Sequence, residues 1–448
     1  MSLRLEETSI EELLKGLDDR NFNVEDLTYI KRIEHLNPLV HSVSQINPDA
    51  SDVARSKDAE RQRGDKLGKL HGIPILIKDV FLTKDRLKST SPSLKHNNFE
   101  ATSVQRLRDQ GAVLLGKTVP SQASGGWSVV GGQCLAPYHK EQDPSGSSSG
   151  SAVAACLGLS AAALGTETSG SLSSPAQKPS VVSIKPTVGL TSRYGVYSVS
   201  EWQDTVGVIA RSVKDAAIVL TAIHGPDPND SFTVSDPRDS EDVQEPSEAT
   251  DFALACKESG LQGNMRKSLE AYETNPESLH TLADVIRYTE SSEEEGNDKW
   301  GVDECLKCEK LGEQYDLESP EYLKSLEWRN QIGKQIQELL DRTNCDFILA
   351  PSIDTSANVG GCPTVGVPLG FYPEDTPISR RKSSGLVSVG PNVPFAALLV
   401  GRRWDDFNLI SAAFAFEQAT KARHQVAPII SSDVKLLVQN ARGMDACL

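Results

Sequence analysis

Three short segments of this 448-residue chain carry side chains that could together attack a carbonyl carbon. Lys78 ends the apolar run GIPILIK, and two loops rich in serine and glycine follow it, GSSSGS at residues 146–151 and GTETSGS at residues 165–171. A serine hydroxyl is a poor nucleophile until an adjacent base takes its proton as it attacks. The three segments could therefore supply the nucleophile, the base and the anion-binding loop of an acyl-transfer reaction.

Lysine can be the base of such a site only while its amine is uncharged. The residues before Lys78 are apolar, with isoleucine or leucine at positions 73, 75, 76 and 77. Burial among such residues disfavours the ammonium form and lowers the pKa, which makes a lysine a general base near neutral pH. Lys78 is therefore the predicted proton acceptor.

The turn TSGS at residues 168–171 is predicted to stabilise an oxyanion. Glycine lets the backbone approach a substrate closely, and a tight turn can direct several N–H groups at the point where negative charge develops. The candidate donors are the backbone N–H groups of Thr168, Ser169, Gly170 and Ser171.

The same segments, together with others in order along the chain, resemble the amidase signature family, the Ser-cisSer-Lys amidohydrolases, and in particular its fungal-type amidases. The resemblance runs from about residue 27 to residue 235 and from about residue 347 to residue 428. The strings that carry it are GIPILIKD at 72–79, PSGSSSGS at 144–151, GTETSGSLSSPA at 165–176, KPTVGL at 185–190, QDT at 203–205, VGRRW at 400–404 and FAFEQAT at 414–420. So many strings in one order make the resemblance specific.

The resemblance implies a role for each residue of the site. Ser171 would form the acyl-enzyme, Ser147 would be the bridging serine that follows a cis peptide bond, and neutral Lys78 would receive the proton through Ser147. Ser148 would support the loop, and residues 168–171 would form the oxyanion hole. The implied activity is hydrolysis of a carboxylic amide to an acid plus ammonia or an amine, with no metal and no nucleotide cofactor.

Several residues depart from the family pattern and leave two other interpretations open. Ser173 stands where members commonly carry arginine, Gln177 lies in a stretch that is usually small and apolar, and Glu167 replaces a common aspartate. Residues 237–251 are short and acidic where members have a longer segment, so a shortened sheet edge is expected. One alternative is a weakly active or non-catalytic protein with the amidase fold, and another is a glutamine-hydrolysing subunit of an amidotransferase.

Two other motif matches lack the context that their chemistry requires. Residues 111–118 fit the P-loop formula, but a strand is expected over residues 112–115, and Pro120 disfavours a helix at the end of the motif. Residues 146–150 fit the nucleophile-elbow formula with Ser148 as the nucleophile, but a polar loop precedes them where a strand is required. Phosphate binding is therefore rejected, and the elbow is the less favoured enzyme interpretation.

The composition is that of an ordinary soluble enzyme. The 46 basic and 62 acidic residues give a net charge of −16, which disfavours nucleic acids and anionic membranes as partners. No run of 18 apolar residues and no apolar leader is present, so we expect no membrane span and a cytoplasmic location. Cys305 and Cys308 form only a weak zinc signal. The expected partner is a small-molecule amide, and a homodimer is left open.

The order of elements predicts an α/β fold, with a mixed, twisted β-sheet core flanked on both faces by helices. Strands are expected over residues 73–77 and 112–115, and helices over residues 11–17, 24–36, 152–163 and 213–223. The expected organisation is N-terminal helices over 1–60, a catalytic core over 61–235, an acidic, variable and largely helical insertion over 236–340, the C-terminal part of the same core over 341–430, and a tail over 431–448.

Overall fold

The computed structural model describes residues 7–65, 68–87, 99–121, 125–234, 279, 281–292, 302–316, 318–351 and 355–431. The expected shortening of the sheet edge falls on residues 237–251, which lie outside the described residues. Most of the expected tail, from residue 432 onward, lies outside them as well.

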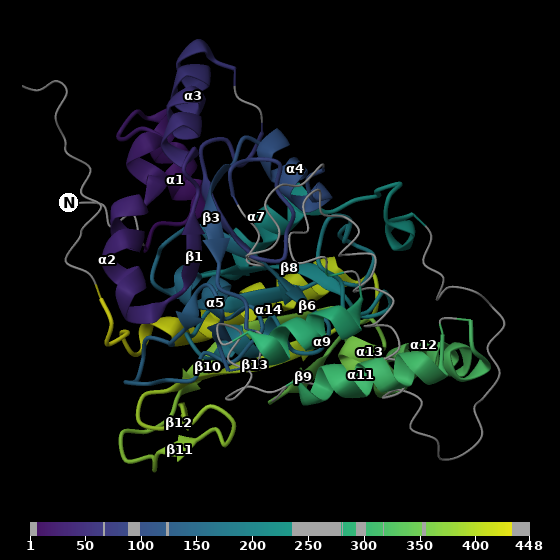
Figure 1. The fold of residues 1–448 in the computed structure, drawn as a ribbon. Helices are drawn as coiled ribbons and strands as arrows, with labels where there is room; N and C mark the ends of the chain where they lie inside the picture. The colour runs from purple at the N-terminus through teal and green to yellow at the C-terminus, as the bar shows by residue number, and fades with distance from the viewer. Residues whose placement is uncertain are drawn as a thin grey trace, which may run out of the picture.

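A nine-stranded β-sheet forms the centre of the described structure (Figure 1). In spatial order its strands are β1 (Val43–Ile46), β3 (Val113–Thr118), β2 (Pro74–Lys78), β6 (Ala162–Glu167), β8 (Thr205–Ala210), β7 (Val182–Lys185), β10 (Thr364–Phe371), β13 (Pro394–Val400) and β9 (Ile348–Ala350). β3, β2 and β6 run parallel, and the other neighbouring pairs are antiparallel. The sheet is therefore mixed, as the sequence predicts.

Helices cover both faces of this sheet. Successive residues of a strand point to opposite faces. Ile209 of β8 packs in one cluster with α5 (Ser149–Cys156) and α6 (Ser173–Gln177), whereas its neighbour Val208 joins a larger core that includes α7 (Val213–Ile223). The predicted α/β architecture with helices on both faces is confirmed.

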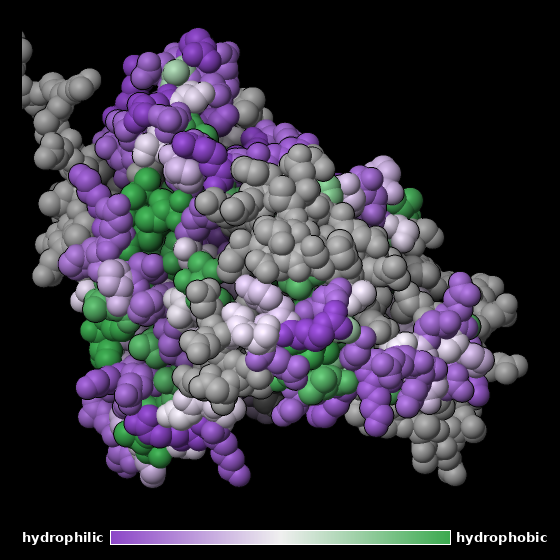
Figure 2. Space-filling view, viewed as in Figure 1, coloured by the Kyte–Doolittle hydropathy of each residue, from purple (hydrophilic) through white to green (hydrophobic). Residues whose placement is uncertain are grey.

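Nine further α-helices belong to the described structure. They are α1 (Ile10–Asp18), α2 (Ile30–Val40), α3 (Ala50–Arg63), α4 (Thr102–Asp109), α9 (Leu282–Ser291), α11 (Asp303–Gln314), α12 (Pro320–Thr343), α13 (Thr355–Val359) and α14 (Asp406–Thr420). In Figure 1, α1 to α3 lie near β1 and β3, and α12 packs at the opposite edge against β9. Figure 2 shows mainly hydrophilic residues over α3, α11 and α12. None of the described helices combines the length and the apolar character that crossing a bilayer requires.

Both expected strands and two of the expected helices are confirmed. β2 and β3 occupy the predicted positions, and β3 extends to residue 118. α1 begins with the predicted capping box, in which Ser9 and Glu12 each accept a hydrogen bond from the other's backbone N–H. α7 spans residues 213–223, as its apolar spacing predicts.

The helix expected over residues 24–36 is interrupted. Tyr29 has a left-handed backbone with φ of 51°, and it separates the 3₁₀ turn η2 (Glu25–Thr28) from α2. α2 then continues through Pro38 to Val40, although a proline inside a helix removes one backbone hydrogen bond. Apolar spacing alone did not reveal the break.

The helix expected over residues 152–163 is also wrong in its second half. α5 ends at Cys156, and Gly158 has the positive φ of 60° that is common after a helix. Ala162 already belongs to β6, which is hydrogen-bonded to β2 on one side and to β8 on the other. Pairing inside the sheet therefore outweighs the helix preference of an alanine-rich segment.

The start of α5 packs against backbone with no free space. A Cβ atom added to Gly150 would lie 2.2 Å from the Ser42 carbonyl oxygen and 2.5 Å from the Val119 backbone nitrogen. We therefore expect Gly150→Ala to lower the free energy of unfolding by about 3 kcal/mol, measured by denaturant titration. Gly390→Ala is the control, because its added Cβ would make only ordinary contacts, at 3.4 Å or more. Equal stability of the two variants would contradict this account of the packing.

Candidate active site

The parallel pairing of β2 and β6 brings two predicted segments to the same end of the sheet. Ile77 of β2 is paired with Leu164 of β6, so Lys78 lies beside the end of the neighbouring strand. The amine of Lys78 donates a hydrogen bond to Thr166 Oγ1 at 2.9 Å. β6 then continues into the turn that carries Ser171.

Lys78 is in direct contact with the first serine loop. Its Nζ donates to Ser147 Oγ at 2.7 Å, and the peptide bond between Gly146 and Ser147 is cis. Lys78 is only 2% exposed, whereas Ser147 is half-buried. The lysine is therefore shielded from water, and the serine connects it to the accessible side of the site.

Burial lowers the pKa of Lys78 from 10.5 to about 7. The carboxylates of Asp204 and Glu167 act in the opposite direction, because their negative charge favours the ammonium form. A large fraction of Lys78 is therefore uncharged near neutral pH. An uncharged amine can donate to Thr166 and at the same time accept the hydroxyl proton of Ser147.

A backbone hydrogen bond connects Ser171 to the loop that carries Ser147. Its carbonyl oxygen accepts a hydrogen bond from the Ser148 N–H at 3.0 Å, and its side chain is half-buried. Within the described residues, the Ser171 hydroxyl forms no hydrogen bond to Ser147. Catalytic hydrogen bonds are commonly longer in a free enzyme and shorten when substrate binds.

The backbone of the 168–171 turn has free donors. Gly170 adopts a positive φ of 80°, which glycine allows without strain. In the described part of the chain, the N–H groups of Ser169, Gly170 and Ser171 have no acceptor. These donors are available to a ligand, which is what the predicted oxyanion hole requires.

Ser148 has a supporting position. It is completely buried, and its Oγ donates to the Thr166 carbonyl oxygen at 3.2 Å. A nucleophile must be accessible to substrate, so this geometry disfavours the elbow interpretation. The P-loop match is also disfavoured, because its Lys117 lies inside β3 and pairs with Asp79 at 3.4 Å.

Two departures from the family pattern contact each other. Ser173 Oγ donates to Glu167 Oε2 at 2.8 Å, and the same oxygen accepts from the backbone N–H groups of Leu172 at 2.7 Å and Ser173 at 2.8 Å. Gln177 donates to the Ser173 carbonyl within α6. The glutamate and the serine therefore form one hydrogen-bonded unit directly after Ser171.

Three contacts of the site were not predicted. Thr166 is a partner of Lys78, Glu167 anchors the residues after Ser171, and Asp204 accepts from Thr168 Oγ1 at 2.6 Å. All three lie in strings that the sequence analysis identified, GTETSGS and QDT. Pairing the strand that ends at Lys78 with the strand that precedes the second loop would have indicated the contact between Lys78 and Thr166.

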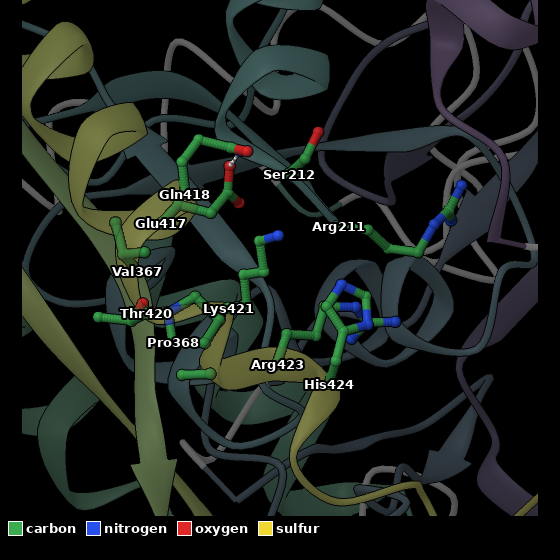
Figure 3. Close-up of a pocket in the computed structure, with 11 residues that line it drawn as sticks. Arg211, Ser212, Val367, Pro368, Glu417, Gln418, Thr420, Lys421, Arg423 and His424 are labelled. Atoms are coloured by element: carbon green, nitrogen blue, oxygen red, sulfur yellow. Dashed lines mark hydrogen bonds between the residues drawn. The ribbon is translucent and has the colours of Figure 1, made fainter.

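A cavity of about 380 Å³ lies elsewhere in the described structure (Figure 3). Its lining includes Arg211, Glu417 and Lys421, and burial raises the pKa of Glu417 to about 6. Arg211 follows the last residue of β8, which pairs with the first residue of β6. Lys78 and Ser171 lie at the other end of these strands, so this cavity is separate from the site.

The mixed sheet brings a buried lysine into contact with a serine, and an uncharged lysine in that position could accept the proton of a serine hydroxyl. The family model Amidase matches residues 27–260. A putative amidase of Arthroderma benhamiae is 35% identical over 479 residues, covering 90% of this chain and 80% of that protein. The chain belongs to the amidase family, and it is an amidohydrolase that acts on C–N bonds.

Two further similarities bear on the kind of amidase. The native peptide amidase of Stenotrophomonas maltophilia has a structure that matches with a TM-score of 0.79 and 29% identity, covering 94% of this chain and 98% of that one. A glutamyl-tRNA(Gln) amidotransferase subunit of Geobacter metallireducens is 28% identical, covering 89% of this chain and 94% of that protein.

Proposed function

We propose that this chain hydrolyses a carboxylic amide through an acyl-enzyme on Ser171, with Ser147 relaying protons to Lys78. The observation that carries the proposal is the 2.7 Å contact between Lys78 Nζ and Ser147 Oγ. It is supported by the burial of Lys78, which lowers its pKa to about 7 and so supplies an uncharged base.

The first half-reaction forms the acyl-enzyme. Ser171 Oγ attacks the amide carbonyl carbon, its proton passes to Ser147, and the Ser147 proton passes to Lys78 Nζ. The negative oxygen of the tetrahedral intermediate accepts hydrogen bonds from the free N–H groups of Ser169, Gly170 and Ser171. The C–N bond then breaks, and the leaving nitrogen takes a proton from Lys78 through Ser147.

The second half-reaction releases the acid. A water molecule attacks the acyl carbon, and its proton follows the same path through Ser147 to Lys78. The ester bond to Ser171 breaks, and the Ser171 oxygen regains a proton through Ser147. Lys78 is uncharged again at the end of the cycle, so no group is consumed.

The substrate is proposed to be a small-molecule amide, and C-terminal peptide amides belong in the first panel because a peptide amidase is among the similar structures. Primary amides, anilides and fatty amides complete the panel. A cytoplasmic location and a homodimer remain predictions.

A glutamine-hydrolysing role within an amidotransferase is the second candidate, supported by the similarity to a glutamyl-tRNA(Gln) amidotransferase subunit. The two candidates differ in what the isolated chain does. A free-standing amidase turns over amides without a partner, whereas the glutamine-hydrolysing component of an amidotransferase acts on glutamine and delivers ammonia to a partner. Comparing glutamine with the other amides on the isolated chain separates them.

A fluorophosphonate probe tests the nucleophile directly. Ser171 Oγ is expected to attack the phosphorus and displace fluoride, and mass spectrometry of the digest should find the adduct on the peptide that contains Ser171. The labelling rate should rise with pH around a midpoint near 7, because only uncharged Lys78 accepts the proton. Label on Ser148, or no label on a folded sample, would contradict the assignment.

A further inference from the structure

The turn that carries Ser171 is attached at both ends to buried carboxylates that the mechanism above does not use. We propose that Glu167 and Asp204 are a pair of positioning residues, which hold the turn from its two ends and supply the negative charge that faces Lys78. This inference rests on the proposed function, because it concerns the same nucleophile and base.

Glu167 holds the end of the turn that follows Ser171. Its Oε2 accepts three hydrogen bonds, from the Leu172 N–H, the Ser173 N–H and the Ser173 hydroxyl, all within 2.8 Å. The side chain is 1% exposed, and no described residue donates a hydrogen bond to its Oε1. Glu167 is the last residue of β6, so it ties the turn back to the strand from which the turn starts.

Asp204 holds the end of the turn that precedes Ser171. Its Oδ1 accepts from Thr168 Oγ1 at 2.6 Å. Its Oδ2 accepts from Ser198 Oγ, the Val199 N–H and the Ser200 N–H at 2.6–2.9 Å. Burial raises the pKa of Asp204, and these four donors oppose that effect by stabilising the ionised form.

The other charges beside Lys78 offset one another. Asp79, the next residue along the chain, lies 3.4 Å from Lys117 of β3, and both side chains are buried. Ser44 of β1 also donates to Asp79. The charge that favours the ammonium form of Lys78 therefore comes from Asp204 first and from Glu167 second.

Each carboxylate thus contributes both hydrogen bonds to the turn and a negative charge near Lys78, and substitutions can separate these two contributions. Glu167→Gln and Asp204→Asn keep the side-chain length and remove the charge. Glu167→Asp keeps the charge and is too short to reach the Leu172 and Ser173 N–H groups. Thr168→Val removes the hydroxyl that Asp204 accepts from and leaves the carboxylate in place.

The experiment measures the rate constant of fluorophosphonate labelling of Ser171 against pH for each variant of the full chain. For Glu167→Gln and Asp204→Asn we expect the midpoint to move to lower pH by about one unit, because a negative charge that favours protonated Lys78 is lost. For Glu167→Asp and Thr168→Val we expect an unchanged midpoint and a plateau rate about 10- to 100-fold lower, because the turn is misplaced.

Asp406→Asn is the matched control. Asp406 is 7% exposed, as Asp204 is, and it likewise accepts from a threonine, through the Thr187 N–H and hydroxyl. Its charge is directed at Lys185 and not at Lys78. This variant should lose stability and keep the labelling midpoint.

The outcomes separate this inference from the proposed function. If the wild-type chain labels at Ser171 while Glu167→Gln and Asp204→Asn keep its midpoint, the charge role is overturned. If Glu167→Asp and Thr168→Val keep the wild-type plateau rate, the positioning role is overturned. These two variants decide the positioning role even if Glu167→Gln or Asp204→Asn does not fold. A folded wild-type chain that does not label overturns the proposed function itself.

Discussion

Ser171→Ala is expected to reduce amide hydrolysis by about 10⁴-fold or more while the chain stays folded. The change removes one half-buried oxygen atom and keeps the backbone contact between the Ser171 carbonyl and the Ser148 N–H. Without the hydroxyl no acyl-enzyme can form, and only substrate binding and the backbone donors of the turn remain. Turnover of the best amide in the panel and the thermal unfolding midpoint measure the two effects.

Ser169→Ala is the control for this prediction. Ser169 belongs to the same turn, but its proposed contribution is a backbone N–H, which alanine retains. We expect its turnover to stay within a few-fold of the wild-type rate. A Ser171→Ala variant that keeps substantial activity would exclude the acyl-enzyme mechanism, and equal losses in both variants would indicate that the turn tolerates no change.

Lys78→Met is expected to lower turnover by about 10³-fold or more and to stabilise the chain at pH 6 by about 3 kcal/mol. Methionine fills the buried space and cannot accept a proton. A lysine at this position lowers the free energy of unfolding of the chain, because burial in the folded state disfavours the ammonium form. Its pKa falls from 10.5 to about 7 on burial, which costs about 5 kcal/mol when the amine is charged. Losing the hydrogen bonds to Ser147 and Thr166 offsets about 2 kcal/mol of the gain.

The stabilisation should depend on pH in a defined direction. Below pH 7 both the folded and the unfolded chain carry a protonated Lys78, so the full cost is present. Between pH 7 and pH 10.5 only the unfolded chain is protonated, and the stability of the wild-type chain relative to the variant rises with pH. Denaturant titrations at pH 6 and pH 10 should show the advantage of the variant disappear. A stability difference that does not change with pH would contradict a buried lysine of lowered pKa.

Much of this site follows from the sequence because two of its three parts, Lys78 and the turn at residues 168–171, lie where a strand ends. Lys78 is the last residue of an apolar run that is long enough for only one strand. The glycine-rich turn at residues 168–171 follows a second strand. Two parallel strands side by side bring such ends together. The resemblance to a family then supplies the order of the residues, and the contact between Lys78 and Ser147 agrees with it.

What the sequence did not reveal depends on the path of the backbone and on which strands become neighbours. Glu167 and Ser173 were separate departures from a pattern, and their contact becomes visible only when the chain turns back on itself. Ala162 and Ala163 continue an alanine-rich stretch, yet they lie in a strand because β2 and β8 are on either side of them. Tyr29 breaks a helix without any glycine or proline beside it. For the two alanines, pairing inside the sheet outweighed the local helix preference.

The different exposure of Lys78 and the two half-buried serines has a practical consequence for chemical labelling. An amine of pKa about 7 would react readily with activated esters if they could reach it, but only 2% of Lys78 is exposed. Surveys of reactive lysines in whole-cell extracts would therefore overlook this residue, while serine-directed reagents would reach the proposed nucleophile beside it.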